Sequence, residues 1–159
     1  MSDPLSPSAQ KVQNALHEYG LDVKVIELPA STRTAIEAAQ AVGCEVGQIV
    51  KSLIFRRKQS GLPVLLLVSG SNRVNEATVA ALLGEAIEKA NADFVRQYTG
   101  YVIGGVPPVG HSDKLLTFVD EDLLQYTELW AAAGTPNALF RIPAQDLLKI
   151  SAGTACKIT

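Results

Sequence analysis

The residues from Val64 to Val68 form an unbroken apolar run that ends at Ser69. A strand with one solvent-facing side alternates apolar and polar residues, whereas a strand buried on both faces is apolar almost throughout. The segment from Lys51 to Arg57 is also strand-like, and the polar residues that separate the two segments suit a turn. The sequence therefore predicts a pair of strands, of which the second lies inside the protein.

Apolar spacing, capping residues and glycine stops predict the other elements. Thr34 and Glu37 have the spacing of a capping box, so a helix is expected to begin at Thr34. Pro143 is expected at the first position of the last helix, which runs to residue 148. Further helices are predicted at 8–19, 75–83 and 92–98, a helical turn at 120–125, and strands at 21–28, 101–103, 115–119, 129–133 and 138–142.

The chain has 159 residues and no break in composition, so we expect one α/β domain over residues 1–159. Cys44 and Cys156 are far apart and lack a CxxC partner, and only His17 and His111 could join them in a metal site. No metal or other cofactor is expected. The sequence shows no signal-peptide pattern and no apolar stretch of membrane-spanning length, so a cytoplasmic location without membrane contact is expected.

The formal net charge of −2 argues against a protein that binds nucleic acid along a broad basic face. Any such contact should be small. Arg56, Arg57 and Lys58 form a local basic cluster before a predicted turn. The pattern favours a solvated hairpin tip; the alternative is a nucleic-acid contact that adjoins Lys51 and extends to Arg73.

The segment GGVPPVGH, from Gly104 to His111, predicts a stiff loop of exposed backbone amides. Glycine permits conformations and close approaches that side chains forbid, while Pro107 and Pro108 fix the backbone and remove two N–H donors. Such a loop can aim amides at an ester carbonyl, or at the oxyanion that forms from it. The alternative is a tight turn at the end of a strand. The spacing matches neither a P-loop nor a dinucleotide-binding motif.

Lys51 opens the first predicted strand and shares one strand face with Leu53 and Phe55. A lysine is rarely buried without a partner, so it either points out at the strand end or lines a cavity. Spacing alone favours the exposed position. A cavity-lining lysine, together with the glycine-proline loop, would make an anion-handling site.

His111 is the last residue of the loop and is followed by Ser112 and Asp113. A turn histidine that caps the next segment is the commoner interpretation, and the alternative is a general base oriented by Asp113. No serine or cysteine nucleophile accompanies it at a recognisable elbow. Cys44 has no basic neighbour in the sequence and is interpreted as a small packing residue.

Four segments carry a family resemblance: STRTAIEAAQAVGCEVGQIVKSLIF (31–55), VSGSNRVN (68–75), GGVPPVGH (104–111) and AAGTPNALFRIPAQDLL (132–148). Together they resemble the YbaK/ProX family of prolyl-tRNA editing domains, which are free-standing aminoacyl-tRNA deacylases. Lys51 matches the family lysine, and Gly104 to Pro108 matches its GxxxP loop. The likeness covers nearly the whole chain. It implies an α/β (α+β) fold with a mixed, mostly antiparallel sheet, curled into a barrel-like core and surrounded by helices.

The resemblance implies hydrolysis of the ester that joins an amino acid to the 3′ adenosine of a tRNA. The implied partners are the acceptor end of an aminoacyl-tRNA and, for the choice of tRNA, an aminoacyl-tRNA synthetase. Gly104, Gly105 and Val106 would form the catalytic loop, in which the amides of Gly105 and Val106 stabilise the oxyanion. The resemblance reverses the preference from spacing, so that Lys51 would line the cavity and hold the terminal nucleotide through its phosphate or ribose. The 2′-hydroxyl of the substrate would activate the water.

The candidate substrate-binding residues belong to the loop or lie in other segments of the chain: Thr32, Ser69, Ser71, Pro107, Pro108, His111, Thr135 and Asn137. Thr32 would border the pocket. The two serines would hydrogen-bond the adenosine or the amino acid. Thr135 and Asn137 would read the amino-acid side chain.

Three positions bear on which amino acid is removed. Leu28 stands where the cysteine-removing branch has a tyrosine, Leu139 lies near an aspartate of that branch, and Thr135 lies near a histidine of the alanine-removing branch. Neither branch fits, so serine or threonine is expected, with alanine next and cysteine after it. The alternative function is a non-catalytic module that binds a nucleotide or an aminoacyl adenosine. A generic hydrolase with His111 as its base is a third option.

Overall fold

The computed structural model describes residues 4–159. Strand β3 (Pro63–Ser69) lies in the interior of the sheet, and each of its residues is buried. It pairs antiparallel with β2 (Ile49–Arg57) and parallel with β5 (Leu116–Asp120). The predicted strand pair and the double burial of its second member are confirmed.

Within residues 4–159, the other strands are β1 (Val25–Glu27), β4 (Ile87–Lys89), β6 (Glu128–Ala132), β7 (Ala138–Pro143) and β8 (Thr154–Cys156). The helices are α1 (Pro7–Glu18), α2 (Ala35–Val42), α3 (Glu76–Leu83), α4 (Ala92–Thr99) and α5 (Ala144–Ser151), and the 3-10 helices are η1 (Val46–Gln48) and η2 (Glu121–Gln125). The capping box before α2 is confirmed, because Thr34 Oγ1 accepts from Glu37 N at 3.1 Å and the Glu37 carboxylate accepts from Thr34 N at 3.3 Å.

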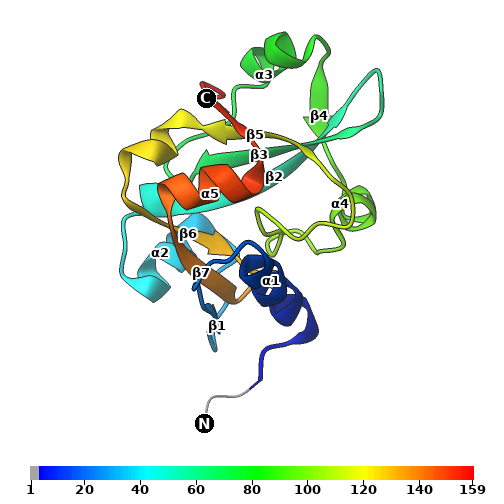
Figure 1. Cartoon of the computed structure of the whole chain (residues 1–159). Coiled ribbons are helices and arrows are strands. Elements are labelled where there is room, and N and C mark those ends of the chain that lie inside the picture. The colour runs from blue at the N-terminus through cyan, green and yellow to red at the C-terminus, as the bar shows by residue number, and fades with distance from the viewer. Residues whose placement is uncertain (1–3) are drawn as a thin grey trace.

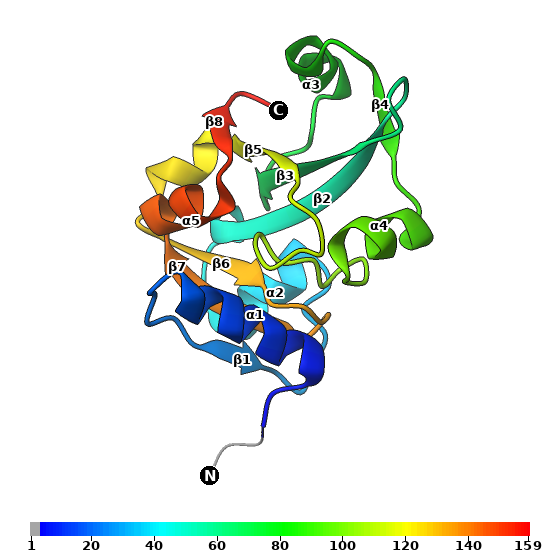
Figure 2. The same ribbon diagram turned by 45° about the vertical axis from the view of Figure 1, so that its right-hand side comes forward.

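The sheet has the order β1-β7-β6-β2-β3-β5-β8, and β4 pairs with β2 outside this path. The pairs β1–β7, β2–β3, β2–β4 and β6–β7 are antiparallel, whereas β2–β6, β3–β5 and β5–β8 are parallel. Figures 1 and 2 show β6 and β7 crossing below β2 and β3, so the sheet is curled. The expected mixed, mostly antiparallel and curled sheet is confirmed.

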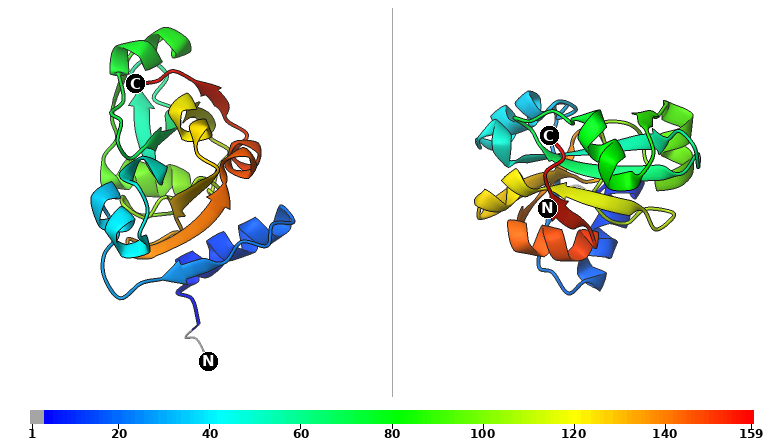
Figure 3. Two further views of the ribbon diagram at one scale, coloured as in Figure 1. Left: turned by 90° about the vertical axis from the view of Figure 1, so that its left-hand side faces the viewer. Right: turned by 90° about the horizontal axis from the view of Figure 1, so that it is seen from above.

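Apolar side chains cover both faces of β3. Leu65 and Leu67 belong to the largest core cluster, which also contains Leu16 of α1. Leu66 belongs to a second cluster, to which α3 contributes Val79. Figure 3 shows α1 and α3 at opposite ends of the molecule. Because each face of β3 is covered by a different part of the chain, the sequence of β2 and β3 does not by itself reveal which face borders a functional site.

Residues 101–103 do not form the expected strand. Tyr101 is turned inward, and its hydroxyl donates to the Gly110 carbonyl at 2.9 Å. The amide of Gly105 donates to the Val102 carbonyl at 3.0 Å. These two bonds close the segment on itself, so it does not pair with a neighbouring strand.

Three further expectations need correction. The strand expected at 21–28 shortens to β1, because the side chain of Gln13 bonds the Val23 carbonyl at 2.7 Å and the Val25 amide at 2.8 Å. Pro143 directly precedes α5 and is not its first helical residue. Strands β4 and β8 were not expected, since three residues are too few to show an alternating pattern.

Candidate active site

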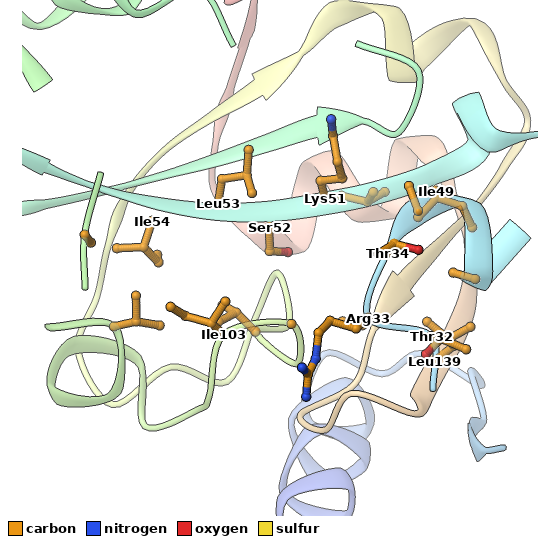
Figure 4. A pocket seen from close by; sticks show the side chains of 18 of the residues that line it. Thr32, Arg33, Thr34, Ile49, Lys51, Ser52, Leu53, Ile54, Ile103 and Leu139 are labelled. Carbon is orange, nitrogen blue, oxygen red and sulfur yellow. The ribbon is translucent and has the colours of Figure 1, made fainter. Parts of the chain in front are cut away.

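A cavity of about 600 Å³ lies between β2, the start of α2 and the glycine-proline loop. Figure 4 shows β2 above it, Ile103 of the loop below it and Thr34 at its side. Its wall is mostly apolar, with the polar side chains of Thr32, Arg33, Thr34, Lys51, Ser52 and Lys89 among its residues. No carboxylate or imidazole from residues 4–159 lines it. The volume falls in the usual range for small-ligand sites.

Strand β2 sends neighbouring side chains to opposite sides. Ser52 and Ile54 point toward the cavity, whereas Lys51 and Leu53 point away from it (Figure 4). The ammonium group of Lys51 donates a hydrogen bond to the Asn72 carbonyl oxygen. Lys51 therefore borders the cavity near its backbone, while its charge lies on the other side of the strand.

A buried carboxylate supports this lysine. Burial lowers the pKa of Lys51, the charge of Arg73 lowers it further, and the charge of Asp120 acts in the opposite direction. Asp120 is 1% exposed and accepts from Ser69 N at 3.0 Å and from Asn72 Nδ2 at 2.9 Å. Asp120 thus holds the turn whose carbonyl oxygen binds Lys51.

Ser69 and Ser71 lie near this turn and not at the cavity. Ser69 Oγ donates to the Gly47 carbonyl at 2.7 Å and lies 3.2 Å from Ser71 Oγ. The structure therefore separates both serines from the cavity that the glycine-proline loop lines.

The loop brings Gly104 and Val106 into the cavity wall. The Gly105 amide donates to the Val102 carbonyl at 3.0 Å, and the Gly105 carbonyl accepts from Gly134 N at 2.8 Å. The Val106 amide makes no hydrogen bond to any of residues 4–159. Of the two expected oxyanion donors, the Gly105 amide is occupied by the turn, whereas the Val106 amide has no partner in the described part of the chain.

The turn formed by Thr135, Pro136 and Asn137 packs against the loop. A Cβ atom on Gly105 would lie 2.9 Å from the Thr135 backbone, so this contact requires glycine. Thr135 Oγ1 donates to Asn137 Oδ1 at 3.0 Å, and Asn137 Nδ2 donates to the Leu28 carbonyl at 2.7 Å. Neither residue lines the cavity, and their polar groups hold the turn in place beneath the loop.

Thr32 lies in the cavity wall. Its hydroxyl donates to the Pro136 carbonyl at 3.0 Å, and its amide donates to the same oxygen at 2.7 Å. Because the hydroxyl is occupied, Thr32 shapes the wall and joins it to the turn.

His111 and Pro108 lie behind the loop, in the wall of a second cavity of about 870 Å³. His111 Nε2 is 2.6 Å from the carbonyl oxygen of Pro107, which is itself buried. Burial lowers the pKa of His111; the bond to Pro107 opposes this shift, and the charge of Lys11 adds to it. The structure thus places His111 against the back of the loop, outside the cavity that Gly104 and Val106 line.

Three polar side chains of the cavity had no role in the sequence-based predictions: Arg33, Ser52 and Lys89. Ser52 Oγ is buried without a hydrogen-bond partner in the described part of the chain. Arg33 lies beside Gly104. Strand alternation places Ser52 on the face opposite Lys51 but gives it no role, whereas Arg33 had no signal beyond its place before the Thr34 cap.

No helix within residues 4–159 is long and apolar enough to cross a membrane. The same residues contain no group of three or more His, Cys, Asp or Glu side chains that could hold a metal ion. Residues 29–150, which include the cavity and the loop, match the family described as the aminoacyl-tRNA editing domain. The chain belongs to this family. The resemblance drawn from its four sequence segments is confirmed, and the activity of this family of editing domains is aminoacyl-tRNA deacylation, a hydrolysis.

Relatives of this editing domain include free-standing proteins and a synthetase. A solved structure called "Crystal structure of a putative trans-editing enzyme for prolyl tRNA synthetase" is 52% identical, has a TM-score of 0.93, and is matched over 98% of this chain and 99% of its own. The Enterococcus faecalis protein named "Putative Cys-tRNA(Pro)/Cys-tRNA(Cys) deacylase EbsC" is 25% identical over 127 residues, 79% of this chain and 77% of that protein. The proline–tRNA ligase of Limosilactobacillus fermentum is 35% identical over 94 residues, 57% of this chain and 16% of the ligase.

Proposed function

We propose that this editing domain acts in trans as a hydrolase that cleaves the ester between a small amino acid and the 3′ adenosine of a tRNA. The observation that carries the proposal is the unpaired Val106 amide in the wall of the cavity beneath β2. A tetrahedral intermediate carries negative charge on the former carbonyl oxygen, and an N–H group held in a stiff loop stabilises that charge without reorganising. Pro107 and Pro108 supply the stiffness.

The proposed water activation relies on the substrate. No carboxylate or imidazole of residues 4–159 lines the cavity, so the 2′-hydroxyl of the terminal ribose is the base we infer. The water oxygen bonds to the carbonyl carbon as its proton passes to the 2′-oxygen. As the ester C–O bond breaks, the proton that the 2′-hydroxyl originally held passes to the 3′-oxygen, and the free amino acid leaves.

Serine and threonine are the proposed amino acids, with alanine next. The buried Ser52 hydroxyl lacks a partner, and a hydroxyl on the substrate side chain would supply one. A thiol is a weaker partner and alanine offers none. Cysteine is the competing candidate, because EbsC is named for cysteinyl-tRNA.

The ammonium group of Lys51 is proposed to hold the tRNA end from the side of β2 that faces Asn72. A point charge with three donors suits a phosphate or a ribose there. The net charge of −2 argues against a broad basic face that would contact much of the tRNA. We therefore assign the choice of tRNA to an aminoacyl-tRNA synthetase that binds the same substrate.

The test is a panel of tRNAs mischarged with serine, threonine, alanine or cysteine, in which ester loss is compared with uncatalysed decay. Wild-type protein should hydrolyse the seryl and threonyl esters fastest. Lys51→Ala should slow ester hydrolysis by about tenfold, which corresponds to the loss of one charge-assisted hydrogen bond. Lys24→Ala, a change at an exposed site, should leave the rate unchanged. Fastest loss of cysteine would correct the amino acid. Retained binding of an aminoacyl-adenosine analogue without ester loss at substrate levels of enzyme would identify a non-catalytic binding module instead.

A further inference from the structure

The cavity wall contains three cationic residues, which differ in what their charges contact. Lys51 donates its hydrogen bond to the Asn72 carbonyl across β2. Lys89 lies on the short strand β4, opposite Phe55 of β2. Arg33 lies next to the glycine-proline loop (Figure 4). Of the three, Arg33 is the one whose side chain packs against this loop, where the ester is expected.

The stem of Arg33 is fixed by packing against Gly104. A Cβ atom on Gly104 would lie 2.8 Å from Arg33 Cγ and 3.4 Å from its Cδ and Nε. Any larger residue at position 104 would force the arginine stem to move. The backbone φ of Gly104 is +88°, which also favours glycine. The loop and the arginine stem thus pack against each other, and Figure 4 shows the guanidinium group pointing away from β2.

The guanidinium group of Arg33 has no counter-charge among residues 4–159. Its residue is exposed, and its side chain makes no hydrogen bond or ion pair with residues 4–159. The cavity wall offers no carboxylate either. A planar guanidinium beside an open site is well suited to bind a phosphate through two parallel hydrogen bonds.

We propose that Arg33 binds a backbone phosphate of the single-stranded tRNA end and so sets the distance from that phosphate to the loop. This inference rests on the proposed function, because it takes the ester to lie at Gly104 and Val106. It assigns a contact with a phosphodiester oxygen to Arg33, a residue that was not among the site residues predicted from the sequence. Lys51 and Arg33 then hold the tRNA end from the two sides of β2.

The experiment measures equilibrium binding of an uncharged RNA minihelix that ends in CCA, at several salt concentrations. Arg33→Gln should weaken binding by about tenfold, which corresponds to one charge-assisted contact. The slope of log K against log salt should become shallower by about 0.7, the value for one single-strand phosphate. Arg33→Lys should keep the salt dependence of wild type and bind with intermediate strength. The lysine retains the positive charge but lacks the two parallel N–H donors of the guanidinium group.

Arg141→Gln is the matched control, since Arg141 is exposed on β7 and does not line the cavity. It should change neither binding nor slope. An Arg33→Gln protein with wild-type binding and slope would overturn the proposal, and so would an equal loss in Arg141→Gln. Because the minihelix carries no ester, this binding experiment does not depend on the proposed hydrolysis. A shallower slope for Arg33→Gln, together with no deacylation of any mischarged tRNA, would support the phosphate contact and reject the proposed deacylase activity.

Discussion

His111 Nε2 lies 2.6 Å from the carbonyl oxygen of Pro107. A carbonyl oxygen only accepts, so Nε2 carries the proton and donates it. The ring also stands edge-on to Tyr101, with its centroid 6.5 Å away, and Lys11 lies over the Tyr101 ring. His111, the last residue of the loop, is thus hydrogen-bonded to Pro107 in the middle of the loop, the residue that follows Val106.

This relationship predicts that His111 supports the loop. His111→Phe should lower the free energy of unfolding by about 1–3 kcal/mol, because the buried Pro107 carbonyl loses its partner. In ester hydrolysis, kcat should fall while KM stays close to wild type, since the loop shifts and the cavity remains. Urea unfolding and steady-state kinetics measure the two effects. An unchanged stability with kcat abolished would instead indicate a general base.

The direction of the His111 pKa shift predicts a pH dependence of stability. Burial holds the pKa of His111 below its ordinary value of 6.5 in the folded protein. The unfolded chain therefore binds the proton first as pH falls, so this contribution to stability is complete above about pH 6.5 and is lost toward the lower folded pKa. Urea unfolding at pH 7.5 and 5.5 should show a smaller loss in His111→Phe than in wild type. Equal losses would contradict the assignment.

Gly104→Ala tests the fit between the loop and Arg33. Gly104 and Gly84 both have positive φ, +88° and +80°, but only a Cβ on Gly104 meets another side chain, whereas the space around Gly84 is open. Gly84→Ala should cost about 1–2 kcal/mol of stability from strain alone. Gly104→Ala should cost at least as much and also raise KM for the aminoacyl-tRNA. Equal KM values in both variants would show that the Arg33 contact has no role in binding.

Ser52→Ala separates stability from substrate choice. The buried hydroxyl has no partner, so its removal should leave stability unchanged or raise it by up to about 1 kcal/mol. Hydrolysis of the seryl ester should fall by about tenfold, the cost of one lost hydrogen bond to a buried group, while that of the alanyl ester changes little. Thermal unfolding and the mischarged-tRNA panel measure both effects. A parallel fall for serine and alanine would remove Ser52 from the account of specificity.

Asp120→Asn tests the network behind Lys51. The Asp120 carboxylate accepts hydrogen bonds from the Ser69 backbone amide and from the Asn72 side chain. The NH2 group of an asparagine side chain at this position would face these N–H donors and could not accept from them. We expect a loss of about 2–3 kcal/mol of stability. Asp122→Asn is the control, because Asp122 is half-buried and its carboxylate accepts only from Asn72, at 2.8 Å. Its loss should be clearly smaller in urea unfolding.

The sequence predicted β3, the capping box of α2 and most helices, because each of these depends on local spacing. It could not show where Lys51 points. Alternation correctly grouped Lys51 with Leu53, but β2 is covered on both faces, and the cavity lies on the face of Ser52. The Gly105 amide was expected to be free, and a turn bond to Val102, which no residue pattern reveals, occupies it. Contacts between distant segments, such as Arg33 with Gly104, depend on the tertiary fold.

The central claim is that the Val106 backbone amide stabilises the oxyanion, and the most direct test removes that N–H group alone. Replacing Val106 by its α-hydroxy analogue converts one amide to an ester and keeps the side chain. Hydrolysis of seryl-tRNA should then slow by about 10²–10³ in kcat with little change in KM. The same replacement at Val109, which is buried in the loop but outside this cavity, should leave kcat near wild type. Equal rates for the Val106 ester and wild type would contradict the account.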